Sequence, residues 1–342
     1  MSHRALSMFL MTGACAHSSN HAGPPAASAT TLALPGAPPD GVFLDYLGYD
    51  PVHHNVWVPA GGTGKVDIID ATTGNLTSID GFPTKEMERH GQKRQVGPSS
   101  VTMGDGVAYV GNRGDSTICA FDLGTLAKQA CVTLDAMPDG LQYVASTKEV
   151  WVTTPRDQSI RILDVTTPGA PATKDVIRFD GEPEGFAVDN AHGVFFTNLE
   201  DKDKTLVIDL KSHATTHTWN PACGEDGPKG LIFEAATNHL LVVCPAHVET
   251  LDVAHDGAVL GKLEVGDGLD AIDYVAERHQ VFAAAGKAQK IVVASLAADG
   301  KLTAVSTIAT AKGARNAVAT EDGTAYVAVG PAGTILVMPP VH

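Results

Sequence analysis

The stretch PDGLQYV at 138–144, followed by EVWVTT at 149–154 and SIRILDV at 159–165, contains the pattern that decides the fold. A Pro-x-Gly-apolar entry opens an alternating strand, a polar turn follows, and a second strand rich in Val, Tyr or Trp leads to a third strand that contains Asp near its end. Two further clear copies begin at PEGFAV (183–188) and PKGLIF (228–233). Short strands that recur in this order, separated by turn residues, predict a repeated all-β unit.

Looser copies raise the number of units to seven. They begin at 45–50, 98–103, 269–274 and 315–320. A fourth, weaker strand follows in most units, and four strands in about 40–45 residues is typical of a propeller blade. The sequence therefore predicts an all-β, seven-bladed β-propeller with four-stranded blades.

The seventh unit has only three strands, the last of them at 335–338. The apolar segment at 30–34 precedes the first unit and is long enough to supply the missing outer strand. We expect it to complete the last blade, because closing the ring removes the sheet edges that an open array would expose.

Three segments resemble a known repeat. YVGN at 109–112 with STICAFDLGT at 116–125 is similar to the YVTN repeat and its downstream strand, and VWVT at 150–153 and FFTN at 195–198 are similar to it as well. The resemblance covers about 40–338 and implies a propeller of the YVTN (NHL/lactonase-like) kind. Such propellers include binding proteins, surface-layer components and lactonases, so the resemblance implies no single activity.

The N-terminus has the features of an export signal. Arg4 precedes the apolar segment 5–11 and the small residues before Cys15, as in the bacterial lipoprotein signal, although Thr12 stands where that motif usually has Leu. We therefore divide the chain into a signal at 1–15, a flexible tether at 16–29 and the propeller at 30–342. The expected location is periplasmic or cell-surface, with a lipid anchor on Cys15.

Charge restricts the partners. The formal net charge is −15, from 39 acidic against 24 basic residues. Such a surface repels phosphate backbones, which argues against nucleic acid as a partner, and it also keeps a protein soluble. Beyond the leader no apolar run is long enough to span a membrane, so we expect membrane association only through the lipid anchor, and a monomer.

The cysteines fit an oxidising compartment. Of the five, Cys15 belongs to the leader and four remain. Cys119 and Cys131 flank a hairpin at similar distances from its turn, and Cys223 and Cys244 lie within one repeat, which predicts the disulfides Cys119–Cys131 and Cys223–Cys244. The alternative is four buried thiols. No pair has the CxxC spacing of a common zinc site.

The first strand of each blade borders the central channel, so the residue that opens it should lie at the channel mouth. Four of these seven positions carry carboxylates. Clustered carboxylates repel one another unless a cation neutralises them, and oxygen ligands suit Ca²⁺. We therefore predict a Ca²⁺ site, resembling that of lactonase-type propellers. The alternative is that the acids cap strands, bind water or pair with Lys229. The predicted metal ligands are Asp45, Asp139, Glu184, Asp270 and Asn316, and the remaining ring positions are Ser99 and Lys229.

An insert at 83–97 interrupts the repeat between the first two units. It is predicted to form a short helix that begins near Thr84 and ends at Gly91, and to lie over the mouth. It carries His90 and Arg94 in the densest basic patch of an acidic chain. The alternative is a solvated surface loop. The predicted ligand-binding residues are Arg94, Lys229, Ser99 and Arg156.

Two functions agree with these features. The first is an exported binding module that takes a small-molecule or protein ligand at the channel mouth and the insert. The second is a Ca²⁺-dependent lactonase or ester hydrolase, in which the ion polarises a carbonyl and His90 or His247 transfers the proton. The sequence has no nucleophile elbow, phosphate-binding loop or HExxH motif.

Overall fold

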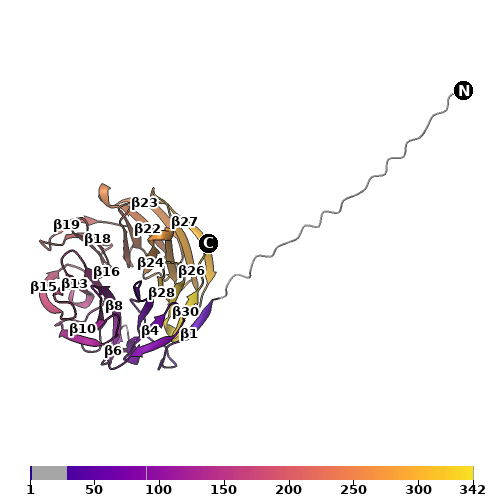
Figure 1. Cartoon of the computed structure of the whole chain (residues 1–342). Coiled ribbons are helices and arrows are strands. Elements are labelled where there is room, and N and C mark those ends of the chain that lie inside the picture. The colour runs from indigo at the N-terminus through magenta and orange to yellow at the C-terminus, as the bar shows by residue number, and fades with distance from the viewer. Residues whose placement is uncertain (2–28, 90, 342) are drawn as a thin grey trace.

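The computed structural model describes residues 1, 29–89 and 91–341, and within them the strands form a ring of seven sheets. Each sheet is a blade of four antiparallel strands, and a separate two-stranded sheet lies between blades 1 and 2. In Figure 1 the inner strands β8, β16, β24 and β28 lie around the centre of the ring, and the outer strands β15, β19, β23 and β27 lie at its edge. The predicted seven-bladed propeller is confirmed.

In blades 1 to 6 the inner strand comes first in the chain, and the other three strands follow it outward. Blade 1 contains β2 (Gly48–Asp50), β3 (Asn55–Pro59), β4 (Val66–Asp70) and β5 (Leu76–Ile79). Blade 2 contains β8 (Pro98–Gly104), β9 (Val107–Asn112), β10 (Thr117–Asp122) and β11 (Lys128–Thr133). Blade 3 contains β12 (Leu141–Val144), β13 (Glu149–Thr154), β14 (Ser159–Asp164) and β15 (Ala172–Arg178). Blade 4 contains β16 (Pro183–Asp189), β17 (Val194–Leu199), β18 (Lys204–Asp209) and β19 (Thr215–Trp219).

Blade 5 contains β20 (Leu231–Glu234), β21 (His239–Val243), β22 (His247–Asp252) and β23 (Ala258–Glu264). Blade 6 contains β24 (Ile272–Val275), β25 (Gln280–Ala285), β26 (Lys290–Leu296) and β27 (Leu302–Ala309). Blade 7 contains β28 (Ala314–Ala319), β29 (Ala325–Val329), β30 (Thr334–Met338) and β1 (Thr30–Ala33).

Blade 7 joins the two ends of the propeller. β1 pairs antiparallel with β30, with Thr30 opposite Val337 and Ala33 opposite Thr334. The outer edge of β30 is therefore covered by the segment that precedes blade 1. No blade of the ring has to be completed by another molecule.

Helical structure in the described residues is limited to five short 3₁₀ turns, and no helix among them has the length and apolarity needed to cross a membrane. The turns are η1 (Gly61–Thr63), η2 (Pro155–Asp157), η3 (Val253–His255), η4 (Ala276–Arg278) and η5 (Gly330–Ala332). η1, η2 and η5 connect the second and third strands of their blades. They therefore lie at the end of the ring where the inner strands begin.

Apolar side chains fill the space between neighbouring blades. Trp151 of blade 3 stacks on Phe195 of blade 4 with ring centroids 4.4 Å apart, and both are fully buried. An aromatic pair of this kind contributes about 0.5–1.5 kcal/mol beyond the area it buries. Because both faces of the middle strands are covered, their sequences are apolar runs, whereas the outer strands β11 and β15 are mostly exposed.

The turn between the inner strand and the second strand repeats one backbone feature. In each blade it contains a residue with positive φ, a conformation that Gly, Asn and Asp adopt most readily. These residues are His54, Asp105, Lys148, Gly193, Asn238, His279 and Gly323. The recurrence at equivalent positions supports the repeat that the sequence predicts.

Both predicted disulfides are present. Cys119 and Cys131 are paired residues of β10 and β11 in blade 2. Cys223, in the connection from blade 4 to blade 5, is bonded to Cys244 at the end of β21. Because disulfides persist in oxidising compartments, the two bonds indicate such an environment for the folded chain. Cys15, the predicted lipidation site, lies outside the described residues.

The insert forms a hairpin of β6 (Lys85–Arg89) and β7 (Gln92–Val96), so the predicted helix from Thr84 to Gly91 is wrong. Met87 is the only large apolar residue in β6, and a helix would need apolar partners three or four positions away to bury a face. Gly91 has φ +73°, which suits the tight turn of a hairpin.

Candidate functional site

A cavity of about 730 Å³ opens at the end of the channel where the inner strands begin. Its walls come from the residues that open the inner strands and from the connections between second and third strands. The volume lies within the range of roughly 300–1,000 Å³ that is typical of small-molecule sites. Its central charged residues are Asp45, Arg113, Asp139, Glu184, Glu200, Lys229, Asp270 and Arg315.

Most of the predicted ring residues meet at this cavity. Asp45, Asp139, Glu184 and Asp270 all line it. Asn316 lies deeper, beside a second cavity of about 120 Å³ that shares Asp45, and its Nδ2 donates to the backbone oxygen of Asp45 at 2.9 Å. The repeat therefore brings four carboxylates together at the mouth, as the ring predicts.

Arg113 neutralises two of these carboxylates. It comes from the connection between β9 and β10 of blade 2, and its side chain is 5% exposed. Its Nη2 lies 2.9 Å from Asp45 Oδ2 and also forms an ion pair with Asp139. A buried guanidinium between two carboxylates takes the place that a bound cation would have.

The other acids at the mouth also have cationic neighbours. Arg315 lies 3.6 Å from Asp45 and 3.4 Å from Asp270, and the field of Asp270 raises the pKa of Arg315. Lys229 Nζ lies 2.5 Å from Glu200 Oε2. With guanidinium groups already among the carboxylates, the donor set does not fit a Ca²⁺ ion.

Glu184 makes no ion pair within the described ranges. Burial raises its pKa to about 8, with further contributions from the negative charges of Glu200, Asp45 and Asp270. The hydroxyl of Tyr46 donates to Glu184 Oε1 at 3.4 Å. Glu184 is therefore mostly protonated at neutral pH and can act as a hydrogen-bond donor toward the cavity.

Three guanidinium groups surround one aromatic ring at the mouth. The Cζ atoms of Arg94, Arg113 and Arg315 lie 4.1, 4.8 and 5.7 Å from the centroid of the Phe43 ring. Cations over an aromatic face are held by the ring quadrupole. Phe43 therefore gathers positive charge from the insert, from blade 2 and from blade 7 at one side of the cavity.

The hairpin insert forms part of this wall. Met87 and Arg94 are paired across β6 and β7, and both line the cavity. The segment before the hairpin is anchored to blade 2, because Asn112 Nδ2 donates to the backbone oxygen of Pro83 at 3.0 Å. The insert thus lies at the mouth, as predicted, although its secondary structure differs.

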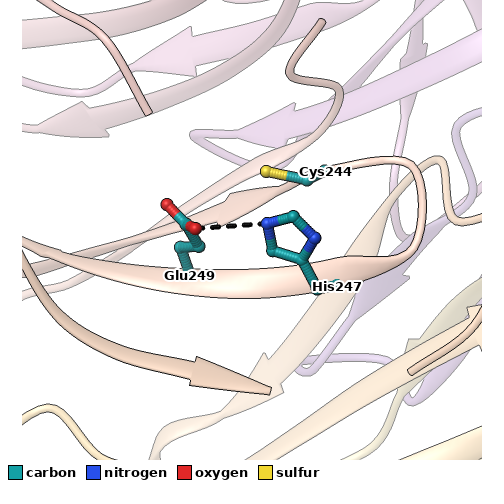
Figure 2. Close-up of side chains that lie close together, drawn as sticks. All are labelled: Cys244, His247 and Glu249. Carbon is teal, nitrogen blue, oxygen red and sulfur yellow. Dashed lines mark hydrogen bonds and ion pairs between the residues drawn. The ribbon is translucent and has the colours of Figure 1, made fainter. Parts of the chain in front are cut away.

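The remaining predicted residues divide into two groups. Lys229 and Arg156 line the cavity, whereas Ser99 is fully buried and is absent from the cavity wall. His90 lies outside the described residues. His247 begins β22 in blade 5 and does not line the cavity, and its Nε2 lies 3.1 Å from Glu249 Oε1 (Figure 2).

Sequence reasoning missed Phe43 and Arg315 as parts of the mouth. Each lies within two residues of a ring position, Asp45 and Asn316 respectively. Because the inner strands start at the mouth, residues that precede a ring position also face the entrance. Reading two residues upstream of each ring position would have included both.

The sequence matches no protein-family model, and no match was found among curated proteins. Solved structures are similar in fold. A chain of the mitotic checkpoint complex has a TM-score of 0.73 at 13% identity, over 100% of both chains. Hydrazine synthase of Kuenenia stuttgartiensis has a TM-score of 0.70 at 13% identity, over 88% of this chain and 96% of that one.

Virginiamycin B lyase from Staphylococcus aureus has a TM-score of 0.69 at 14% identity, over 92% of this chain and 99% of that one. At such identities the similarity is one of fold. It supports the seven-bladed propeller, a scaffold that commonly binds proteins, while membership of the YVTN repeat family stays a prediction.

Proposed function

We propose that this protein is an exported binding module of the cell envelope that takes a small anionic ligand at its channel mouth. The observation that carries the proposal is a set of exposed cations on the cavity wall, Arg156, Lys287 and Lys312. The guanidinium groups of Arg94, Arg113 and Arg315 lie around Phe43 on the same wall. Guanidinium groups bind carboxylates and phosphates strongly, through charge-assisted hydrogen bonds.

The charge of the wall supports an anion. Acidic and basic residues of the described chain line the cavity in equal number, seven of each, whereas the whole chain has 39 acidic and 24 basic residues. The exposed side chains of Arg156, Lys287 and Lys312 make no ion pair in the part of the chain that the structure describes. These three cations, which we call the rim cations, are available to a ligand.

The apolar part of the wall supports a ligand with an apolar body. Phe43, Met87, Met137 and Leu269 line the same cavity as the cations. Its volume suits a small molecule, whereas a stable protein interface buries about 800 Å² on each partner. We therefore favour a small anion over a protein, and a protein partner would require a larger surface than the mouth.

The hydrolase alternative has less support. The carboxylates that would bind Ca²⁺ are neighbours of Arg113 and Arg315. His247, one of its two predicted proton-transfer residues, is 9% exposed and absent from the cavity wall. Export and lipid anchoring through Cys15 remain part of the proposal, supported by the two disulfides and by the leader sequence.

Titration calorimetry with naphthyl phosphate, naphthoate and neutral naphthol tests the ligand class. We expect the two anions to bind at least about tenfold more tightly than naphthol, and salt to weaken only the anions. Replacing the rim cations together, as Arg156→Met, Lys287→Met and Lys312→Met, should remove most of that preference. Lys211→Met, at an exposed turn of blade 4, is the control. Equal binding of naphthol and the anions would refute the proposal.

A further inference from the structure

A second cluster of chemically active side chains lies in blade 5; none of its residues lines the mouth cavity, although Pro245 between two of them does. One sulfur, nitrogen or oxygen atom from each of Cys244, His247 and Glu249 lies within 4.8 Å of the others (Figure 2). The backbone N–H of Cys244 donates to the oxygen of His247 at 2.9 Å, which closes the tight connection between β21 and β22. His247 and Glu249 are two positions apart on β22 and so face the same side of the sheet.

Glu249 has an unused ligand position. Its side chain is buried, with 5% exposure, and His247 is its hydrogen-bonding partner through Oε1. Its Oε2 is buried with no hydrogen-bond partner. Lys262 is paired with Glu249 across β22 and β23, but its Nζ lies 3.4 Å from Glu264. A buried carboxylate oxygen without a partner is costly, which points to a group that the cluster binds in another state.

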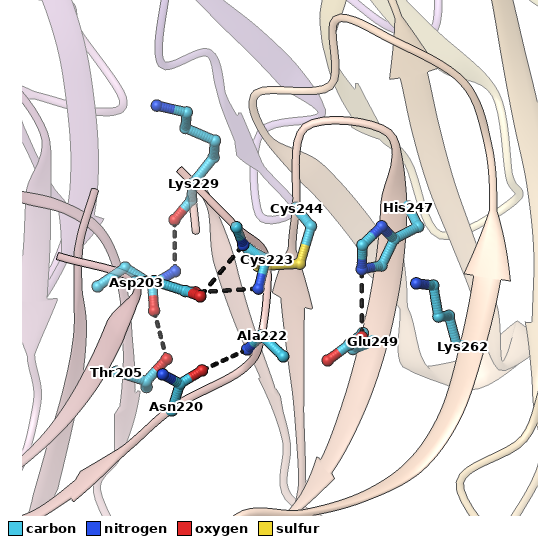
Figure 3. Close-up of a disulfide and its surroundings, with 12 residues drawn as sticks. Asp203, Thr205, Asn220, Ala222, Cys223, Lys229, Cys244, His247, Glu249 and Lys262 are labelled. Carbon is cyan, nitrogen blue, oxygen red and sulfur yellow. Dashed lines mark hydrogen bonds and ion pairs between the residues drawn. A yellow bond between two sulfur atoms is a disulfide. The ribbon is translucent and has the colours of Figure 1, made fainter. Parts of the chain in front are cut away.

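While the disulfide is intact, the sulfur of Cys244 cannot serve as a strong metal ligand. A disulfide sulfur is a weak metal ligand, whereas a thiolate is a strong one. Asp203 holds the other half of the bond in place, because its carboxylate accepts from the backbone N–H groups of Cys223 and Gly224 at 2.9 and 3.1 Å (Figure 3). Breaking the bond would therefore leave the sulfur of Cys244 within 4.8 Å of the ligand atoms of His247 and Glu249, and the sulfur of Cys223 on the far side of Cys244, next to that sulfur.

We propose that reduction of Cys223–Cys244 creates a Zn²⁺ site formed by Cys223, Cys244, His247 and Glu249. Four ligands of this type suit tetrahedral Zn²⁺. Two ligands about 2.1 Å from a tetrahedral ion lie about 3.4 Å apart, and His247 Nε2 and Glu249 Oε1 are already 3.1 Å apart. These two side chains therefore need only a small separation, while the two sulfurs must move apart after the S–S bond breaks and the sulfur of Cys223 must approach the other three ligands.

The redox step is a dithiol exchange. A dithiol reductant supplies two electrons and two protons, the S–S bond breaks, two thiols form, and the reductant becomes a disulfide. Binding of Zn²⁺ then releases both thiol protons, leaving two thiolates on the ion. In either state, the disulfide or the metal ties the connection before β20 to the end of β21. The two states exclude each other.

Cobalt binding tests the proposal, because Co²⁺ on a thiolate gives an intense charge-transfer band in the near ultraviolet. The full chain is used with Cys119→Ser and Cys131→Ser, so that Cys223–Cys244 is the only disulfide in the described chain. We expect no such band in the oxidised protein and one equivalent of Co²⁺ with the band after reduction by a phosphine. Zn²⁺ should displace the Co²⁺, since it binds more tightly to N, O and S ligands.

Single replacements identify the ligands. Cys223→Ser should produce the band without reductant, because Cys244 is then a free thiol. His247→Ala and Glu249→Gln should each weaken Co²⁺ binding more than about tenfold in the reduced protein. His255→Ala, on an exposed turn of the same blade, should leave it unchanged.

Three results would overturn the assignment. One is a reduced protein without the charge-transfer band, and another is a Cys223→Ser protein without that band in the absence of reductant. The third is unchanged Co²⁺ affinity in both His247→Ala and Glu249→Gln. Should His247→Ala fail to fold, Glu249→Gln and Cys223→Ser still decide, because Cys223→Ser must bind the metal in the absence of reductant. None of these measurements depends on the ligand of the channel mouth.

Discussion

Arg113 of blade 2 forms a buried ion pair with Asp45, which lies 68 residues earlier at the entry to blade 1. The same guanidinium also pairs with Asp139 at the entry to blade 3. One side chain therefore joins three successive blades at the channel mouth. Its removal would leave Asp139 buried without a cation and Asp45 with Arg315 alone.

Arg113→Met should lower the free energy of unfolding by about 3–5 kcal/mol, the usual cost of an uncompensated buried charge. Urea denaturation measures this change. Arg178→Met is the matched control, because the exposed pair of Arg178 with Asp157 contributes about 0–1 kcal/mol. Equal stability of the two variants would show that Arg113 has no structural role at the mouth.

Glu184 should make stability fall with rising pH. Its pKa is raised to about 8 in the folded chain, above its ordinary value near 4.5, so the folded state holds a proton that the unfolded state has released. The stability that Glu184 contributes is therefore fully present below about pH 4.5, and this contribution decreases as the pH rises to about 8. Melting temperatures across this range measure the slope.

Glu184→Gln should flatten that slope and raise the melting temperature most at alkaline pH, since glutamine cannot ionise. Glu225→Gln, at an exposed position, should retain the slope of the unmodified protein. If Glu184→Gln keeps the full pH dependence, another group is responsible for it.

The disulfide in blade 2 should stabilise the propeller. Cys119 and Cys131 are 12 residues apart in sequence, and closing a loop of that size contributes about 3 kcal/mol in the chain-entropy model. Replacing both cysteines by alanine should therefore lower the free energy of unfolding by roughly that amount.

Mass measurement after alkylation should detect thiols at 119, 131, 223 and 244 only when a reductant is present. Four alkylated thiols without reduction would contradict the presence of the two disulfides.

Removal of β1 should open the ring. A chain that begins at Leu34 lacks the strand that covers β30, whereas a chain that begins at Ala29 retains it. We expect the shorter chain to unfold at lower urea concentration and to self-associate, because an uncovered strand edge pairs with other chains. Light scattering distinguishes the two. A shorter chain that remains monomeric with an unchanged midpoint would exclude β1 from closing the ring.

Much of the fold follows from the sequence because each blade repeats the same local signals. The Pro-x-Gly entries at 138–140 and 183–185 mark where inner strands open, and this spacing places Asp139 and Glu184 at one mouth. The insert has no second copy to compare, and its capping residues favoured a helix. Its conformation was decided instead by a turn at Gly91 and by packing of Met87 against the mouth.

The ion pairs at the mouth could not be predicted from the sequence as well as the fold could. The ring positions identify which carboxylates meet, but not which long side chains reach them from neighbouring loops. Arg113 extends from the connection between β9 and β10, and its target depends on the arrangement of three blades. The cluster in blade 5 has a local signal, since Cys244, His247 and Glu249 are three and two residues apart, but Cys223 joins it only through the fold.

The pairing of β1 with β30 also determines when the propeller can be finished. Residues 30–33 are among the first of the domain to be synthesised, and residues 334–338 are among the last. Contacts between distant parts of a chain form slowly, and N-terminal parts of a protein emerge first. Blade 7 therefore cannot close before nearly the whole chain has emerged. Until then β1 has no partner strand, and the ring stays open while the chain is being synthesised.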